Sequence, residues 1–428
     1  MTQPAGGVLA ATCVSALVVN ANTSAVAILL PAISADTGMA VSTLQWAVTG
    51  YSLVGAAVIV TSGALGDIYG RRKVFLGGLV LFVASCVLIA LARGGGGVIA
   101  GRCIQGAAGA TILACGMSLI TVANDDKQER LRAVSLWGAA SAVGAAAGPL
   151  LGGVLVDTTG WQGLFWIDAA IAAACIPLTM ATVAESRDTK RSRSIDFAGT
   201  FLVALILAPL IFALTEGSAW GWLSAKTIGC LLVTVAATIA FVMVERRVRA
   251  PLLDLNLLRN RALVAATLSI LVGAGAINGI MFAVSLYFQD PAALRMSAMQ
   301  AGLATLPVTA AAVILAPLIA PIAAKIGIRP TVLTGFVIMT VSFGALGFVK
   351  ADWRYGMFVI PLVGIAIGMS LQNGPASSVS TSAVPPDQVG SASGVSNMAR
   401  YVGAAVMTAI VAGIYSDVSA NRLAAGDA

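Results

Sequence analysis

The chain has 428 residues, of which 58% are hydrophobic and only 10% are charged, and its mean hydropathy is +0.94. Soluble domains carry about 25% charged residues, so this composition excludes a water-soluble fold and makes lipid the principal solvent. The formal net charge is +7 and the chain has no histidine, which removes the commonest general base, proton shuttle and metal ligand.

Thirteen apolar stretches separated by short connectors fill almost the whole chain. Each has about 20 residues or more, enough for a helix to cross roughly 30 Å of hydrocarbon. Helices are required because lipid satisfies no backbone polar groups. The sequence therefore predicts an all-α polytopic membrane protein. The predicted spans are residues 6–31, 44–62, 74–92, 96–123, 133–156, 164–183, 197–215, 224–244, 263–288, 299–322, 331–350, 356–378 and 394–416.

Lys and Arg crowd into every second connector. The connectors after even-numbered spans hold most of these residues, for example Arg71, Arg72 and Lys73 after the second span. By the positive-inside rule, these connectors and the N-terminus lie in the cytoplasm. With thirteen spans, the C-terminus would lie outside. Because basic loops account for the net positive charge, we expect no nucleic-acid partner.

Two features bear on processing and on metal binding. The first basic residue is Arg71, and a cleavable signal peptide needs a basic segment before its apolar core, so we expect the first span to be retained. The cysteines form no C-x-x-C pair, and we interpret them as small buried apolar residues. No metal, cofactor or disulfide framework is expected. The cysteines are Cys13, Cys86, Cys103, Cys115, Cys175 and Cys230.

The charged linkers divide the chain into three parts. Residues 1–183 form an N-terminal bundle of six helices. Residues 184–262 contain two charged linkers with two extra spans between them. Residues 263–428 hold five spans and form the C-terminal bundle. Two helical halves joined by cytoplasmic linkers are typical of pseudo-symmetric transporters.

The connector after the second span reads GALGDIYGRRK, with Gly63, Asp67, Gly70, Arg71 and Arg72 at its fixed positions. The glycines permit a tight turn, and the aspartate at a helix end beside cations favours a charge-assisted clamp. Such a contact can form in one transport state and break in another, as a conformational gate does. The alternative is an ordinary basic loop.

The fifth span contains GAAAGPLLGG, with Gly144, Gly148, Pro149, Gly152 and Gly153. Glycines four residues apart share one helix face and let helix backbones approach closely in lipid. The proline removes a backbone donor and favours a kink. The run therefore predicts a hinge and seal between the halves, and the alternative is ordinary packing of small residues.

The fourth span contains RCIQGAAGA, which places Arg102, Gln105, Gly106 and Gly109 on one helix face. An arginine at the bilayer centre is disfavoured by roughly 2.5–3.5 kcal/mol on insertion scales, so Arg102 should face a cavity or a partner. It lies about 9 Å inside the outer end of the span by helix rise, so snorkelling to that interface is the alternative.

The thirteenth span repeats this pattern with Asn397, Arg400, Tyr401 and Ala404 on one face, although Arg400 could equally snorkel to the cytoplasm. Other polar residues inside spans are candidates for a central substrate cavity. Each is a weak signal, because many such groups only hydrogen-bond a neighbouring helix. They are Asn20, Asn22, Gln45, Trp46, Tyr51, Asn278, Gln372 and Asn373.

The loop at Gly63–Lys73 resembles the signature loop of the major facilitator superfamily, and the glycine run of the fifth span is similar to the antiporter motif of its drug-efflux members. The spacing of Arg102 and Gln105 resembles the family's R-x-x-Q-G motif, in which the arginine is linked to proton coupling and substrate binding. The two extra spans, Gln45-Trp46 and AGLATLP at Ala301–Pro307 resemble the fourteen-helix drug:proton antiporter branch.

The resemblance implies a two-bundle fold that exports amphipathic organic compounds by proton antiport and alternating access. This chain departs from the family pattern in four respects. The branch usually has an aspartate in the first span where Asn22 stands, whereas Asp168 stands where the family more often has asparagine. A basic residue usually follows the loop aspartate, but here it is Ile68. Only thirteen spans are found, so the last helix is expected to be missing through truncation or loss.

Proton antiport needs a group that titrates, and the candidates are Asp67, Asp168 and Glu216. We expect Asp67 to be structural and Glu216 to be peripheral. Asp168 is the first candidate for the proton site, with Arg102 as its modulator. The alternative is that Asp168 is an interfacial aspartate near the outer end of its span.

Other functions remain open on the sequence alone. The alternatives are a facilitator or importer, a metabolite or lipid exporter, and a non-transporting scaffold or sensor. A membrane enzyme is disfavoured because there is no histidine and no cluster of carboxylates inside the spans. No G-x-x-x-x-G-K-[ST] motif exists, which argues against ATP hydrolysis. The expected partners are a small-molecule substrate, protons and the bilayer of a bacterial inner membrane, with a monomer expected.

Overall fold

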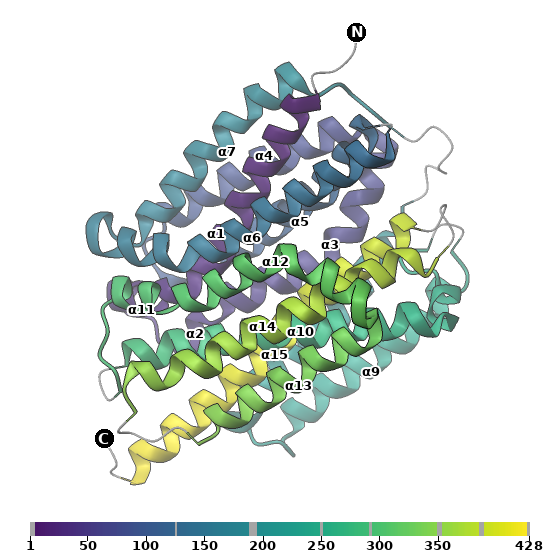
Figure 1. The fold of residues 1–428 in the computed structure, drawn as a ribbon. Helices are drawn as coiled ribbons and strands as arrows, with labels where there is room; N and C mark the ends of the chain where they lie inside the picture. The colour runs from purple at the N-terminus through teal and green to yellow at the C-terminus, as the bar shows by residue number, and fades with distance from the viewer. Residues whose placement is uncertain are drawn as a thin grey trace.

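A computed structural model shows a chain built of α-helices (Figure 1). Within the part of the chain that the structure describes, thirteen helical segments are long and apolar enough to cross a membrane, so the predicted all-α polytopic fold and its thirteen spans are confirmed. The basic linker residues Lys190, Arg191 and Arg193 lie outside the described residues. The structure describes residues 5–124, 126–187, 195–248, 251–290, 293–348, 353–384 and 389–425.

The N-terminal half contains six spans. Helix α1 packs along α6 and also contacts α5 and α7, while α4 packs between α5 and α7, and α3 packs on α5. Long apolar runs without a polar face make these helices, which suits helices surrounded by other helices or lipid. The helices are α1 (Ala5–Thr37), α2 (Val41–Leu44), α3 (Trp46–Tyr69), α4 (Arg71–Ala90), α5 (Gly95–Ala123), α6 (Lys127–Thr159) and α7 (Gln162–Thr182).

The C-terminal half contains five spans. Helix α10 packs along α15 and α14, and α14 also contacts α12 and α13. The tenth span was predicted as one unbroken helix, but it is divided after Ala304, because Pro307 sits in the first turn of α12, where its missing N–H is tolerated. The helices are α10 (Arg261–Gln289), α11 (Ala298–Ala304), α12 (Leu306–Ile326), α13 (Ile328–Leu346), α14 (Tyr355–Ser382) and α15 (Val389–Ala425).

The two extra spans form a hairpin, α8 (Phe197–Trp220) and α9 (Ala225–Glu245), and the 3-10 helix η1 (Leu255–Arg259) follows it. Helix α8 packs against α3 of one half and α15 of the other, so the hairpin lies along a seam between the halves. The Trp46 ring lies 4.3 Å from the Phe212 ring, and Ser218 donates a hydrogen bond to Asp417 at 2.7 Å.

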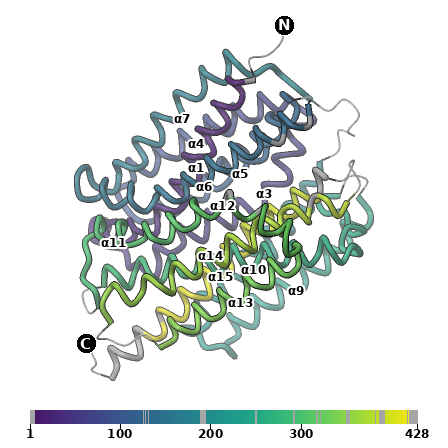
Figure 2. Tube along the Cα trace, in the orientation of Figure 1, coloured from purple at the N-terminus to yellow at the C-terminus, as the bar shows by residue number. Residues whose placement is uncertain are grey.

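The halves meet where α3 packs against α15, where α6 packs against α11 and α12, and where α1 packs against α10. Figure 2 shows the two halves as separate groups of tubes, with α11 lying against the N-terminal half. Near the end of α1, Ser285 donates to the carbonyl of Ala27 at 2.8 Å and Gln289 donates to the carbonyl of Ile28 at 3.2 Å. These hydrogen bonds join α10 of the C-terminal half to α1 of the N-terminal half.

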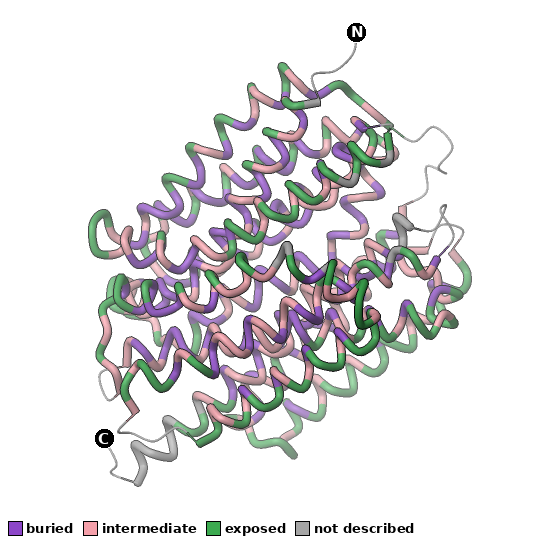
Figure 3. The backbone as a smooth tube through the Cα atoms, in the orientation of Figure 1, coloured by how far each residue is buried: buried purple, intermediate pink, exposed green. Residues whose placement is uncertain are grey.

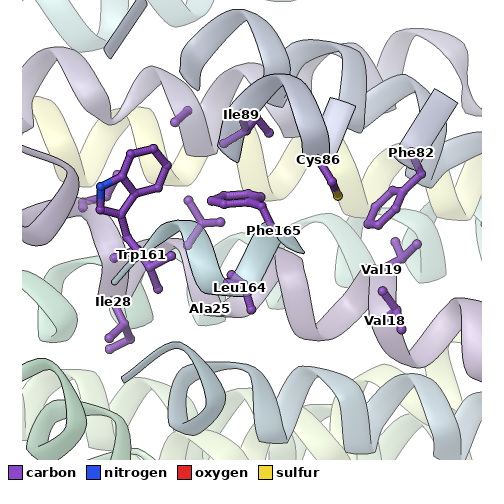
Figure 4. Packing of buried hydrophobic residues seen from close by; sticks show 14 of the residues in the cluster. Val18, Val19, Ala25, Ile28, Phe82, Cys86, Ile89, Trp161, Leu164 and Phe165 are labelled. Carbon is purple, nitrogen blue, oxygen red and sulfur yellow. The ribbon is translucent and has the colours of Figure 1, made fainter. Parts of the chain in front are cut away.

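The apolar residues divide into a packed interior and an exposed outer surface (Figure 3). Phe82, Phe165 and Ile89 are fully buried in one continuous cluster (Figure 4). In contrast, α9 carries exposed Leu232 and Ile239 on its outer face. Such large apolar surfaces are rare on soluble monomers, and a bilayer accounts for them.

Candidate functional site

The site is built where α5 and α3 touch. A Cβ atom added at Gly106 would lie 2.9 Å from the carbonyl carbon of Tyr51, so only glycine permits this approach of the two backbones. The approach brings Arg102 of α5 over Tyr51 of α3, with 4.3 Å from the guanidinium carbon to the ring centroid. This is a cation–π contact in a site without water-exposed surface.

Arg102 is completely buried and its guanidinium is held by three helices. Its Nη1 donates to the side-chain oxygens of Asn22 and Gln105, both at 2.5 Å, and its Nε donates to the carbonyl of Ala47 at 2.9 Å. Its Nη2 has no hydrogen-bond partner among the described residues. The arginine therefore has a fixed interior position, and it does not snorkel to the outer interface.

Asn22 joins this arginine to a carboxylate. Its Oδ1 accepts from Arg102, and its Nδ2 donates to Asp168 Oδ2 at 2.7 Å. Asp168 belongs to α7 and is 4% exposed, so its carboxylate is buried among the helices. In a medium of low dielectric the opposite charges on Asp168 and Arg102 attract strongly, although one amide group separates them.

A second branch of the network reaches α4. Gln105 donates from Nε2 to Cys86 Sγ at 3.0 Å. Cys86 was predicted to be an apolar packing residue, and spacing along the chain gives no signal for this bond. Figure 4 shows Cys86 among apolar side chains, with Phe82 and Phe165 on either side. This branch of the network therefore ends at a sulfur packed among apolar groups.

The loop between α3 and α4 contains an ion pair between Asp67 and Arg71, with Nη2–Oδ1 at 2.9 Å and Nε–Oδ1 at 3.0 Å. Gly70 has φ +117, which other residues rarely adopt. Any Cβ there would lie 2.6 Å from the Glu185 carboxyl carbon. Gly63 has open space on its Cβ side, so the structure gives no steric reason for that glycine.

Glu185 is a partner of this loop that the sequence analysis missed. Its carboxylate accepts from the backbone N–H groups of Arg72 and Lys73, at 3.1 and 3.2 Å, where the positive end of α4 favours an anion. Arg72 also donates to the carbonyl of Met180 at 2.8 Å. Glu185, at the start of the charged linker that follows α7, therefore attaches this loop to the end of α7.

The glycines of α6 face two directions. A Cβ at Gly144 would lie 2.9 Å from the Leu17 carbonyl carbon, and Gly148 and Gly152 continue the same contact with α1. Gly153 faces the other half, since its Cβ would lie 2.8 Å from Met299 Cα. One turn earlier, the backbone of Pro149 approaches Gly302 of α11 in the same way. The run thus joins α1 within one half to α11 across the seam.

The predicted cavity residues do not form one group. Asn22, Tyr51, Arg102 and Gln105 belong to the buried network, whereas Trp46 faces α8. Asn20 of α1 and Gln45, between α2 and α3, also belong to the N-terminal half, and the remaining members belong to the C-terminal half. Their positions are as follows: Asn278 is in α10, Gln372 and Asn373 are in α14, and Asn397, Arg400 and Tyr401 are in α15.

One contact joins the network to the C-terminal half. The Tyr401 ring lies 6.3 Å from the Tyr51 ring. It also fits against Gly55 of α3, where a Cβ would lie 2.6 Å from Tyr401 Cε1. Because Tyr51 also carries the Arg102 guanidinium on its face, a movement of the arginine can reach the α3–α15 seam.

Residues 12–408 match the family model described as Major Facilitator Superfamily. The chain belongs to this superfamily. It is therefore a multi-pass membrane transporter of small molecules and not an enzyme, and the resemblance drawn from the motifs is confirmed.

Curated relatives from this superfamily include resistance and export proteins. The multidrug resistance protein Stp of Mycobacterium tuberculosis is 31% identical over 388 residues, which cover 90% of this chain and 71% of that protein. The tetracenomycin C resistance and export protein of Streptomyces glaucescens is 28% identical, over 94% and 74%. The cephamycin export protein CmcT of Amycolatopsis lactamdurans is 30% identical, over 96% and 85%.

Solved structures agree with the fold of this major facilitator. The human organic anion transporter MFSD10 has a TM-score of 0.66 and 16% identity, with 97% of this chain and 95% of that chain covered. An auto-inhibited peptide transporter of the POT family has a TM-score of 0.70 and 13% identity, with 99% and 91% covered. At these identities the match concerns the fold alone.

Proposed function

We propose that this major facilitator exports amphipathic organic compounds across a bacterial inner membrane in exchange for protons. The export functions printed for its relatives support the direction of transport. The distribution of basic residues supports a cytoplasmic N-terminus. The observation that carries the proton-coupling part is the buried pair of Asp168 and Arg102, joined by Asn22.

Protonation of Asp168 changes the hydrogen bonds that the Asn22 side chain can make. While the carboxylate is charged, it accepts from the Asn22 amide and leaves Oδ1 for Arg102. A protonated carboxyl becomes a donor, which competes with Arg102 for the same amide oxygen. The guanidinium then loses both an acceptor and its nearby negative charge, so protonation favours a conformation in which Arg102 finds other partners.

Asn22 and Asp168 can also be compared with the residues that the drug:proton antiporter branch usually has at these positions. The branch pattern places an aspartate in the first span and an asparagine in the sixth, whereas this chain has Asn22 and Asp168. Since the two side chains are hydrogen-bonded at 2.7 Å, the carboxyl and amide groups have exchanged helices without separating. This exchange supports a titrating pair that persists with its members reversed.

In this proposal, the remaining motifs form the gate and the seal that open and close during transport. The Asp67–Arg71 ion pair belongs to a gate at the cytoplasmic end, and the approach of Gly153 to Met299 seals the opposite end. Substrate would bind near the midplane as the halves, residues 1–183 and 263–428, rock against each other. The cavity residues predicted above, including Asn278, are candidates for its contacts, and a monomer suffices for this cycle.

Reconstituted proteoliposomes test the proposal. The wild type should export dyes or antibiotics faster when a proton gradient is imposed. Asp168→Asn should lose this stimulation but retain counterflow, the exchange of labelled for unlabelled substrate, which also shows that it folds. Glu216→Gln is the matched control, because Glu216 is another carboxyl inside a span but lies outside the network.

The two parts of the proposal fail separately. If Asp168→Asn exports with full proton stimulation, Asp168 is not the proton site. If the wild type moves no compound under any ion gradient while its fold is intact, export itself is wrong.

A further inference from the structure

Arg400 is a cation placed deep inside a membrane span of α15. The span covers Ala392–Tyr415, so helix rise places the Arg400 backbone about 12 Å from its first residue. Its neighbour Tyr401 packs against α3 at the seam between the halves. Arg400 therefore lies beside the region where the two halves would separate during transport.

The guanidinium of Arg400 has few partners. Its one hydrogen bond among the described residues runs from Nη2 to Ser377 Oγ of α14 at 3.5 Å, which is longer than an ordinary hydrogen bond. A guanidinium carries five N–H donors. Unlike Nη2 of Arg102, no nitrogen of Arg400 is both fully buried and unpartnered, and the residue is partly exposed.

No acidic residue lies in the membrane spans of the C-terminal half to balance this charge. The five spans of that half, from Arg261–Gln289 to Ala392–Tyr415, contain neither Asp nor Glu. Their other cations, Arg261 and Arg329, are the first and second residues of their spans and lie at helix ends. Arg400 is thus an interior cation without an interior anion, which is unfavourable in a membrane protein unless another group supplies the negative charge.

The surface beside Arg400 is polar. On α14, Asn373 and Ser377 are one turn apart and partly exposed, and Gly374 and Ser378 between and beside them are exposed. Asn397, one turn before Arg400 on α15, is also partly exposed. A polar helix surface at this depth is poorly suited to lipid and is typical of the wall of a water-filled pathway.

We infer that Arg400 binds a negatively charged group of the substrate, so that the preferred substrates are amphipathic organic acids with a carboxylate, phenolate or sulfonate. This inference rests on the proposed export function. Arginine stays protonated throughout, so Arg400 is a permanent counter-charge and not a second proton site. Ser377 and Asn373 supply neutral hydrogen-bonding groups beside it.

A matched pair of ligands tests the inference by binding alone, without any transport step. The pair is an amphipathic fluorescent dye with one carboxylate and its uncharged methyl ester, titrated against purified protein in nanodiscs of zwitterionic lipid. Arg400→Gln should weaken binding of the acid by about tenfold or more, the loss of a charge-assisted contact. Binding of the ester should change less than twofold, and Arg400→Lys should retain most of the preference for the acid.

The control is Arg329→Gln, which removes a cation from the end of α13 and should leave both affinities unchanged. Three outcomes overturn the inference. The first is equal weakening of acid and ester by Arg400→Gln. The second is a wild type that does not prefer the acid. The third is a dependence on Arg400 that appears only in nanodiscs containing anionic lipid, which would assign the arginine to a lipid headgroup.

The proposed export function and this inference have different failures. If the acid binds through Arg400 but no proton-driven export is found in proteoliposomes, the inference stands and the proposed function falls. If export of the ester matches export of the acid and ignores Arg400→Gln, the function stands and the inference falls.

Discussion

Each half of the molecule holds one arginine well inside a span, and the two arginines have opposite surroundings. Arg102 is 0% exposed, with an amide bridge to Asp168 and an aromatic ring beneath it. Arg400 is partly exposed, with one long contact to a hydroxyl and no carboxylate in any span of its half.

This difference indicates that the two arginines have different roles. A charge that has its own counter-ion and is shielded from water is suited to sensing one event, the protonation of that counter-ion. A charge without a counter-ion beside accessible space is suited to binding an external anion. Tyr51 and Tyr401, whose rings lie 6.3 Å apart, connect the two regions across the seam.

The largest expected effect comes from reversing the titrating pair. Asp168→Asn should reduce proton-driven export by about 100-fold, the upper range of a coupling between two sites. The double variant Asn22→Asp with Asp168→Asn restores one carboxyl and one amide in contact, so it should recover export to within about tenfold of the wild type. Initial rates in proteoliposomes with an imposed pH gradient measure both effects.

The single variant Asn22→Asp tests whether a second carboxyl in the pair changes export. It places two carboxyls in contact, which cannot both ionise easily, and it should therefore shift the pH dependence of export instead of abolishing it. A double variant as inactive as Asp168→Asn would mean that the position of the carboxyl on α7, and not the pair, is required.

A membrane potential should distinguish acidic from neutral substrates. Whatever the number of protons exchanged, export of a monoanion moves one more unit of charge than export of its ester. One unit charge is worth about 2.3 kcal/mol per 100 mV, which corresponds to a gradient about 50-fold steeper. The measurement is the ratio of each dye's concentrations on the two sides of the membrane once export has levelled off, with a potassium diffusion potential of about −100 mV inside. The difference between the ratios of acid and ester gives the effect of the extra charge. Equal ratios for acid and ester would contradict transport of the anionic form.

The sequence predicted what depends on composition and local pattern. The thirteen spans followed from apolar length, because lipid allows little else than helices. The contact of Arg102 with its own helix neighbour Gln105 followed from spacing along one face. The superfamily followed from the loop at Gly63–Lys73 and the glycine run.

What the sequence could not predict are the contacts between helices far apart in the chain. Asn22 and Asp168 are separated by 146 positions, and only the packing of α1 against α7 shows that they form one unit. Glu185 was interpreted as part of a charged linker, although it binds the N-terminus of α4. Likewise, Trp46 was grouped with a cavity, but its ring packs on Phe212 of the extra helix.

Filling a close contact between helix backbones should lower the stability of the protein by a similar amount in either half. A Cβ at Gly144 of α6 would lie 2.9 Å from the carbonyl carbon of Leu17, and a Cβ at Gly403 of α15 would lie 2.9 Å from that of Leu271. Alanine at either position should lower stability by about 1–3 kcal/mol, the usual effect of overpacking. Thermal unfolding in detergent measures the change.

Controls for this pair exist in the same two halves. Gly138 of α6 and Gly344 of α13 have no atom within 4 Å of an added Cβ, so Gly138→Ala and Gly344→Ala should leave the unfolding temperature unchanged or raise it, since alanine favours helices. If Gly403→Ala behaved like these controls while Gly144→Ala did not, the C-terminal half would be the more loosely packed one.

The smallest expected effects concern two glutamines, and they should differ in sign. Gln105 uses both amide atoms, accepting from Arg102 and donating to Cys86. Gln372 is also 0% exposed, but neither of its amide atoms has a partner among the described residues. Replacement of a bonded buried group leaves its partner unsatisfied, which costs about 1–3 kcal/mol, whereas removal of an unpartnered amide removes such a penalty.

We therefore expect Gln105→Met to lower the unfolding temperature and Gln372→Met to raise it, since methionine fills a similar volume without polar atoms. Unfolding of both variants in detergent, with and without the acidic dye, measures the effect. If Gln372→Met is instead destabilised only when the dye is present, the amide of Gln372 is held for the ligand. The contrast between the halves would then extend from one charge to a second polar group, with both groups of the C-terminal half completing their hydrogen bonds only when substrate binds.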